Sequence, residues 1–171
     1  MIAALPGRTP VVPASAFVAP TAVVVGDVVL GEDASVWYGC VVRGDVGSIT
    51  IGARTNIQDG CILHLTRGRG ALQIGDEVTA GHRAILHGAT IHDRCLIGMG
   101  AIVLDDCEIG EESLIAAGSV VLERTIVPPR SFVAGIPAAV RGPIPPDHLA
   151  RLRESADHYV LLAREHARIH G

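Results

Sequence analysis

The stretch Ile91-His92-Asp93-Arg94-Cys95-Leu96-Ile97-Gly98-Met99-Gly100-Ala101-Ile102-Val103-Leu104-Asp105-Asp106-Cys107-Glu108-Ile109 decides the fold. A branched aliphatic residue returns at every sixth place, and small residues such as Cys95 and Cys107 stand two places before the next one. A helix of 3.6 residues per turn cannot keep an apolar stripe at a period of six, and a simple strand lacks this punctuation. A coil of three short strands fits, with each hexad as one side of a triangular prism.

The same period runs outward through most of the chain. The aliphatic places are Val18, Val24, Leu30, Val36, Val42, Ile51, Ile57, Leu63, Ile74, Ala80, Leu86, Ile91, Ile97, Val103, Ile109, Ile115, Val121, Val127 and Val133. It is interrupted within 42–51, 63–74 and 86–91, where a solenoid places loops or corners. The sequence therefore predicts an all-β solenoid whose coils stack as parallel strands about 4.8 Å apart.

The repeat ends before Gly142-Pro143-Ile144-Pro145-Pro146. From Leu149 onward the apolar residues follow a helical spacing, and Asp147 is the expected N-cap. We expect a β-helix domain over 1–140, followed by a linker and a C-terminal α-helix over 141–171 that packs on the solenoid. This helix would cover strand edges that the solenoid otherwise exposes.

Composition excludes several classes of partner. The 171 residues carry a formal charge of −4 with both signs interspersed, so neither a nucleic-acid stripe nor a polybasic membrane patch is expected. The N-terminal residues do not resemble a signal peptide, and no apolar run is long enough to span a bilayer. The four cysteines lack Cys-x-x-Cys spacing, which favours packing roles in a reducing, cytoplasmic compartment.

Counting hexads places two histidines together. Leu63 and Leu86 are successive rungs of one face, so His64 and His87, which follow them, form a column with Arg43. Backbones one rung apart are about 4.8 Å from each other. Two imidazoles at that spacing can share a metal ion, which zinc sites hold at about 2.0 to 2.1 Å per nitrogen.

A third histidine lies on a different face. His82 belongs to the hexad that starts at Ala80, with a corner between it and His87, so it cannot easily join the first two. In a threefold assembly, His82 of one subunit can meet the pair of the next subunit, leaving an open fourth position typical of a catalytic zinc. Gln58 and Asp59, one rung below His82, would enter that interface.

The other histidines and the cysteines have simpler interpretations. Cys40 and Cys61 occupy small-residue places one rung apart, as packing requires. We expect surface or turn positions for the remaining histidines, which are His92, His148, His158, His166 and His170.

The repeat over roughly 12–140 resembles the hexapeptide-repeat proteins, and their left-handed parallel β-helix follows from that resemblance, since parallel crossovers otherwise favour the opposite hand. More narrowly, the chain resembles γ-class carbonic anhydrases. The resemblance rests on Ser35-Val36-Trp37, Arg43-Gly44-Asp45, Ile51-Gly52-Ala53-Arg54-Thr55-Asn56-Ile57-Gln58-Asp59-Gly60, Leu63-His64, Gly81-His82, Ile85-Leu86-His87-Gly88 and Leu96-Ile97-Gly98-Met99-Gly100-Ala101.

This resemblance implies a homotrimer that reversibly hydrates CO2 to bicarbonate. Zn2+, or Fe2+ in some members, would be bound by His64 and His87 of one subunit and His82 of the next. Bound zinc lowers the pKa of water to about 7, which makes hydroxide available as a nucleophile.

The resemblance also implies roles for five further residues. Arg43 and Asp45 would form an ion pair between subunits that organises the site, or that only stabilises the assembly. Gln58 would orient water or bicarbonate, Asn56 would help to hold the substrate, and Tyr159 would lie near the metal.

One departure from the family concerns proton export. Fast members carry an acidic residue directly after Arg-Gly-Asp and further ones in a longer loop, whereas this chain has Val46 and a loop over 65–73 with Arg67 and Arg69. Hydration releases a proton in each turnover, so a missing shuttle predicts slow activity unless Tyr159, a nearby histidine or buffer substitutes.

Three other functions stay open at this point. The same zinc site would suit an acyl-CoA thioesterase, with Arg67 and Arg69 facing an anionic substrate. Hexapeptide acyltransferases would instead need a catalytic histidine without metal. A trimeric scaffold that keeps the metal only for stability is the non-enzymatic alternative.

Overall fold

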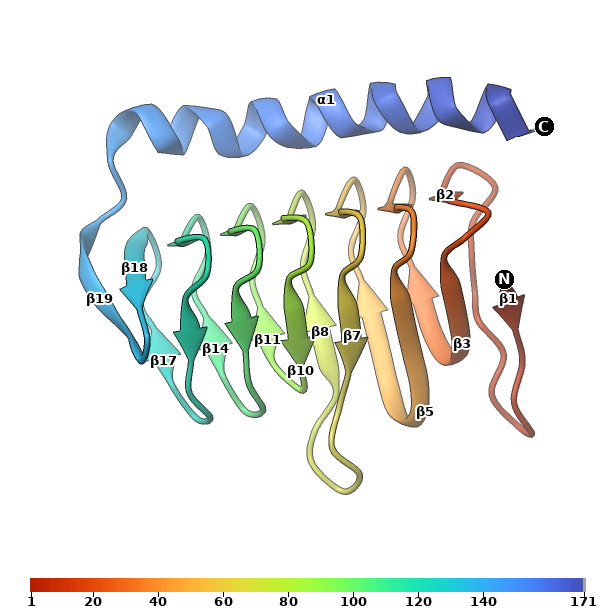
Figure 1. Ribbon diagram of the computed structural model, residues 1–171, viewed down its shortest axis with the longest axis horizontal. Helices are drawn as coiled ribbons and strands as arrows, with labels where there is room; N and C mark the ends of the chain where they lie inside the picture. Colours follow the sequence, from red (N-terminus) through yellow and green to blue (C-terminus); the bar gives the residue numbers. More distant parts are fainter. Residues whose placement is uncertain (171) are drawn as a thin grey trace.

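A computed structural model describes residues 1–170, apart from the side chains of Arg153 and His170, so the expectation for His170 and the last residue of the expected helical segment, Gly171, lie outside the described residues. The strands wind into a solenoid, and a helix lies along it (Figure 1). An eleven-stranded sheet forms two faces and an eight-stranded sheet forms the third. The expected parallel-strand solenoid with one C-terminal helix is confirmed.

The strands of each face are short and follow the hexads. The first face holds β1 (Ile2–Ala3), β7 (Ile62–His64), β10 (Ile85–His87), β13 (Ile102–Val103) and β16 (Val120–Val121). The second holds β8 (Leu72–Ile74), β11 (Thr90–Ile91), β14 (Glu108–Ile109) and β17 (Ile126–Val127). Two longer strands, β3 (Val23–Leu30) and β5 (Val41–Ile51), bend from the first face into the second.

The third face is the eight-stranded sheet. It consists of β2 (Phe17–Val18), β4 (Ser35–Val36), β6 (Asn56–Ile57), β9 (Thr79–Ala80), β12 (Leu96–Ile97), β15 (Leu114–Ile115), β18 (Ser131–Gly135) and β19 (Ala138–Pro143). All its pairings are parallel except that of β18 with β19.

The core is a set of columns of aliphatic side chains in register. Val42 pairs with Leu63, Leu63 with Leu86, and Leu86 with Val103, and all four side chains are fully buried. The strand period of two fixes which neighbours face outward. A shift of one residue in any rung would therefore exchange buried leucines for polar neighbours.

The corners combine a small buried residue with a left-handed residue before it. The left-handed residues outside glycine all have φ between 54° and 61°, and they are Asp33, Arg54, Glu77, Arg83, Arg94, Asp106, Glu112, Arg124 and Arg130. Such a conformation is uncommon for residues with a side chain. Charged side chains from neighbouring coils pair along a corner, as Arg54 Nε does with Glu77 Oε1 at 3.1 Å.

The strands at both ends of the solenoid lie outside the six-residue repeat. β1 pairs in parallel with β3, Ile2 opposite Val24, so the stacking begins before residue 12. At the other end β19 spans the expected domain boundary at residue 140, because the chain turns back there and pairs antiparallel with β18. Both segments satisfy backbone groups at the edge of the repeat without following its period.

The helix α1 (Pro146–His170) starts slightly earlier than expected. The Leu149 amide donates to the Pro145 carbonyl at 3.1 Å, which places Pro146 in the first turn, where its missing N–H costs nothing. Asp147 therefore lies inside the first turn and is not the N-cap. Its carboxylate still interacts favourably with the positive end of the helix dipole.

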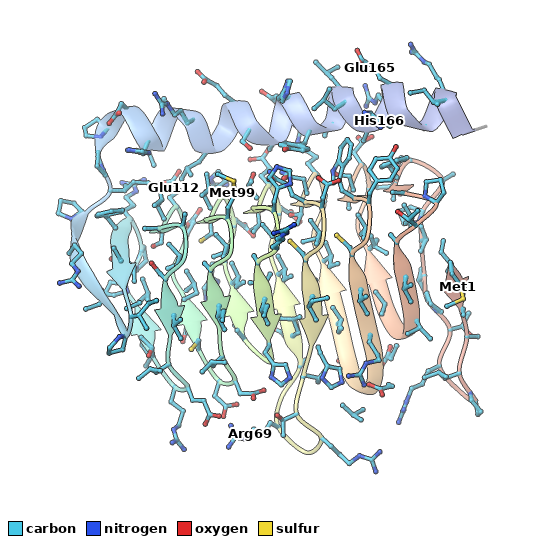
Figure 2. The ribbon with its side chains drawn as sticks, viewed as in Figure 1. Met1, Arg69, Met99, Glu112, Glu165 and His166 are labelled. Atoms are coloured by element: carbon cyan, nitrogen blue, oxygen red, sulfur yellow. The ribbon has the colours of Figure 1, made fainter. Side chains whose placement is uncertain are left out.

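α1 packs along the third face, where it contacts β2, β4, β6 and β9 (Figure 1). Its buried residues are Leu152, Ala156, Val160 and Ala163. Near its C-terminal end, His166 points toward the solenoid, where its Nδ1 lies 2.8 Å from the hydroxyl of Tyr38 (Figure 2). His166 is thus a partly buried docking residue, unlike the surface position expected. No helix among the described residues is long and apolar enough to cross a membrane.

One corner of the third face buries a carboxylate. Glu112 is 4% exposed, and its oxygens accept from Arg130 Nε at 2.7 Å and from Arg94 Nε at 3.3 Å. The hydrogen bond from Arg130 is the main cause that holds the pKa of Glu112 below its usual value, against the opposing effect of burial.

We expect Glu112→Gln to lower the free energy of unfolding by about 1–2 kcal/mol at pH 7, since it removes charge-assisted hydrogen bonds to partly exposed arginines. Because the pKa of Glu112 is lower in the folded state, its ionised carboxylate stabilises the folded protein at pH values above the unfolded pKa of about 4.3. This contribution is lost as the pH falls through the folded pKa. Denaturant unfolding at pH 7 and near pH 3 measures this. The control is the exposed neighbour, Glu111→Gln; equal losses in both variants at pH 7 would contradict the assignment.

Candidate metal centre

Two imidazoles meet on the first face. β7 and β10 pair in parallel with His64 directly opposite His87, which is the neighbouring-rung placement expected from the spacing. The ring centroids are 5.3 Å apart, and His64 Nδ1 lies 3.3 Å from His87 Nε2. Both rings are partly buried, and each histidine is the last residue of its strand, directly before a corner of the solenoid.

A carboxylate holds the far nitrogen of each ring. His64 Nε2 lies 3.0 Å from Asp45 Oδ1, and His87 Nδ1 lies 3.0 Å from Asp105 Oδ2. Ionised carboxylates only accept hydrogen bonds, so both histidines donate from these nitrogens. The two facing nitrogens then both present lone pairs, which repel unless a proton or a cation lies between them.

This arrangement fits a metal ion. Two nitrogens bound to tetrahedral zinc at 2.0 to 2.1 Å are about 3.3 to 3.4 Å apart, which matches the separation of the two facing nitrogens. Histidines that bind metals usually donate their other ring nitrogen to a carboxylate or carbonyl. Within one chain, no three His, Cys, Asp or Glu side chains among the described residues gather to hold a metal.

Arg43 and Asp45 form an ion pair inside the chain, with Arg43 Nη1 2.5 Å from Asp45 Oδ2. The resemblance implied a pair between subunits. Two residues apart on β5, their side chains point to the same side of the strand, which explains the contact within one chain. Desolvation raises the pKa of Asp45, but the hydrogen bonds with His64 and Arg43 outweigh it and hold the pKa below its usual value.

Asp105 was missed by sequence reasoning. It follows β13 in the corner of the next coil and is 5% exposed. Besides His87, it accepts from the Thr66 hydroxyl at 3.0 Å. Burial raises the pKa of Asp105, but the hydrogen bonds from Thr66 and His87 outweigh this effect and hold the pKa below its usual value. The available signal was its place in the coil: Leu86 pairs with Val103, so Asp105 lies opposite Gly88, the residue directly after His87.

His82 lies apart from the other two histidines. It sits in the turn that enters β10, whereas His87 ends that strand, so the length of the strand separates them. His82 Nδ1 lies 2.9 Å from Asp59 Oδ2, and both side chains are more than two-fifths exposed. All three candidate ligands therefore have a carboxylate on one ring nitrogen, and the other nitrogen of His82 faces outward from this pair.

Gln58 and Asn56 form a buried polar chain beneath His82. Gln58 Nε2 donates to Asn56 Oδ1 at 3.1 Å, and Asn56 Nδ2 donates to the Thr79 hydroxyl at 2.9 Å. Thr79 in turn contacts the Ser155 hydroxyl of α1 at 2.9 Å. Asn56 is fully buried, so in this chain it orients Gln58 rather than lying open to a small molecule.

Tyr159 belongs to an aromatic cluster under α1. Its ring lies edge-on to Trp37 at 5.4 Å, and the side chain is half-buried. Burial is the main cause that raises the pKa of Tyr159, and the negative charge of Asp59 adds to it. The phenol is thus on the His82 side of the solenoid.

The long loop after His64 brings together charges from three segments. Arg69 Nη1 lies 3.0 Å from Glu123 Oε2 and 3.6 Å from Asp106 Oδ2. Figure 2 shows Arg69 at the loop, on the side of the solenoid away from α1. Arg67 is exposed on the same loop, and Val46 packs partly buried against the core.

An apolar stripe borders the His64 and His87 column. One residue before each buried rung of the first face, a β-branched side chain points outward, and these residues pair in register: Val23, Val41, Ile62, Ile85, Ile102 and Val120. They are partly exposed, Ile62 by 39%. Six rungs span about 24 Å. Contiguous apolar surface of this kind typically marks an interaction site.

A second apolar surface lies beside His82. A groove of about 530 Å³ runs between the third face and the first half of α1. Its lining includes Gln58, His82, Leu96, Met99, Leu114, Phe132 and Arg151.

Comparisons with known proteins agree with the fold. Residues 88–123 match the family described as bacterial transferase hexapeptide (six repeats). A carbonic anhydrase of Geobacillus kaustophilus is 44% identical over 94% of this chain and 87% of its own length. A crystal structure described as a putative acetyltransferase of Bacillus cereus superposes with a TM-score of 0.95, at 37% identity over 98% of this chain and 97% of that one.

A plant relative gives the class. Gamma carbonic anhydrase 1, mitochondrial, of Arabidopsis thaliana is 41% identical over 94% of this chain, which spans 60% of that relative's length. The solenoid and the repeat define a hexapeptide-repeat protein. Within that class, the chain belongs to the γ-class carbonic anhydrase family.

Proposed function

We propose that this chain is the subunit of a homotrimeric, zinc-dependent carbonic anhydrase that reversibly hydrates CO2 to bicarbonate. The observation that carries the proposal is the pair of facing nitrogens of His64 and His87, 3.3 Å apart with a carboxylate behind each ring. The named activity of the relatives supports the reaction. Fe2+ is the alternative metal, since imidazole ligands suit it as well.

The residues of the proposed site have different roles. His64 and His87, with His82 of a neighbouring subunit, would hold the metal, and Asp45, Asp105 and Asp59 orient their rings. Zinc held by these three imidazoles would supply activated water as the nucleophile for CO2. Gln58, fixed by Asn56, offers its carbonyl oxygen to a polar group at the site.

Two incomplete surfaces support the proposed trimer. The apolar stripe on the first face has its partly exposed residues beside the two-histidine column, while His82 and Asp59 lie exposed at another corner. Surfaces that differ in this way pair head to tail, and a closed head-to-tail contact produces a ring. In a ring of three, every subunit contributes two ligands to one site and one ligand to the next.

Proton export limits this enzyme. Hydration releases one proton per turnover, and neither Val46 nor the loop over 65–73 offers a carboxylate to carry it away. Of the acidic groups that approach the loop, Asp106 and Glu123 are engaged by Arg69, and Asp105 is held by Thr66 and His87. Slow turnover with a dependence on external buffer is the expected consequence.

The four free, buried cysteines agree with a reducing compartment, which we propose to be the cytoplasm.

We expect wild-type protein to bind about one zinc per chain and to hydrate CO2, and His82→Ala to lose roughly nine-tenths of both, because two imidazoles bind zinc far more weakly than three. Elemental analysis and stopped-flow CO2 hydration measure this. The matched control is His92→Ala, a histidine equally exposed and paired with Glu108 on the second face. Zinc retained in full by His82→Ala would contradict the proposal.

The rate of CO2 hydration should rise with the concentration of imidazole buffer, because an external base then removes the proton. Val46→Glu places a carboxylate at the missing shuttle position and should raise the rate in dilute buffer roughly tenfold. Val46→Gln has the same size without the charge and is the control. Fast turnover by wild-type protein that does not depend on buffer would refute the missing-shuttle account.

Acyl chemistry is the second candidate function. The apolar groove beside His82 and Gln58 would accommodate an acyl chain, and a Bacillus cereus relative in structure is described as a putative acetyltransferase. Side-by-side assays of CO2 hydration, thioester hydrolysis and acyl transfer on the zinc-loaded protein separate the candidates. A metal-independent acyl transfer would replace the proposed function, and a metal without any activity would favour a scaffold.

A further inference from the structure

Asp105 is a buried carboxylate with an unusual set of partners. Its Oδ2 lies 3.0 Å from His87 Nδ1 and 3.0 Å from the Thr66 hydroxyl, and its Oδ1 lies 3.4 Å from the Thr66 amide. Arg69 Nη1 is 3.9 Å away and lies closer to Glu123. A carboxylate 5% exposed needs such polar partners to remain in place.

The backbone is shaped to admit this carboxylate. Gly88 follows His87 directly and has φ of 55°, and a Cβ at that position would lie 2.0 Å from Asp105 Oδ1. Only glycine leaves the space that Asp105 occupies. The corner after the ligand strand β10 is therefore fitted to Asp105 on the coil above.

Asp105 also connects the two rungs of the metal centre. Thr66 lies two residues after His64, and Leu65 between them is buried. One carboxylate thus holds the His87 ring on one rung and the start of the loop that leaves His64 on the other. Asp45, the partner of His64, differs because its side chain is 30% exposed and shared with Arg43.

We propose that Asp105 is a positioning residue of the metal centre. By accepting the Nδ1–H of His87 it fixes the tautomer that presents Nε2 toward His64, and through Thr66 it anchors the loop beside the site. A buried acceptor makes a stronger contact than an exposed one, so Asp105 contributes more to this orientation than Asp45 does. The inference rests on the proposed function, since it concerns the same ligands.

Zinc affinity of the whole protein tests this role, measured by competition with a chromophoric chelator. Asp105→Asn keeps the size of the side chain and its contacts to Thr66 but weakens the acceptor for His87. We expect the dissociation constant for zinc to be 10- to 100-fold larger than in wild type. Thr66→Val removes the loop contact alone, and Asp106→Asn removes a neighbouring exposed charge. Both should stay within about threefold of wild type, a range far below the loss of an orienting carboxylate.

The outcomes separate the two proposals. If wild-type protein fails to bind zinc at one ion per chain, the proposed function fails. If wild type binds zinc and Asp105→Asn matches Thr66→Val, Asp105 is only structural and this inference is overturned. Nitrogen-15 spectra of metal-free wild-type protein give a second readout that needs no variant: the Nδ1–H tautomer of His87 is expected, and the Nε2–H tautomer would contradict the role.

Discussion

The in-register hydrogen bonding between parallel rungs is the constraint on which the rest of the structure depends. It stacks Leu63 on Leu86 inside the prism and, one residue later, His64 on His87 outside it. The aliphatic column cannot slip by one residue without burying the histidines and exposing the leucines. Burial of the aliphatic column thus sets the register of the rungs, and this register fixes the two imidazoles about one rung apart.

Register alone does not make a metal centre, because imidazole rings rotate about their own bonds. The carboxylates that hold these rings come from other places: Asp45 from the bend of β5, and Asp105 from the next coil. The third histidine has its own carboxylate, Asp59, at a corner a strand length away. In our account the neighbouring subunit brings that corner to the pair, so folding of one chain completes two-thirds of the site and assembly completes the rest.

The six-residue repeat and the helical spacing after it were predictable from the sequence, whereas contacts outside these two patterns were not. The period of six predicts the solenoid, its buried columns and the pairing of His64 with His87, because counting hexads along the sequence tells which residues lie opposite each other on neighbouring rungs. The docking of His166 on Tyr38, the antiparallel β19 and the contacts of Arg69 escaped this arithmetic, because they depend on side-chain reach and on segments outside the period. Asp105 stands between these cases: its coil position was countable, but the direction of its side chain was not.

The central claim is that ligands from two chains form each site, and mixed trimers test it most directly. His64→Ala and His82→Ala subunits each lack one ligand, so either variant alone should lose roughly nine-tenths of its zinc and its activity. Random assembly of equal amounts places one intact site in every mixed trimer, so the account predicts zinc and CO2 hydration in about one quarter of all sites. Recovery of neither zinc nor activity in the mixture, with trimers intact, would contradict a site shared between neighbours.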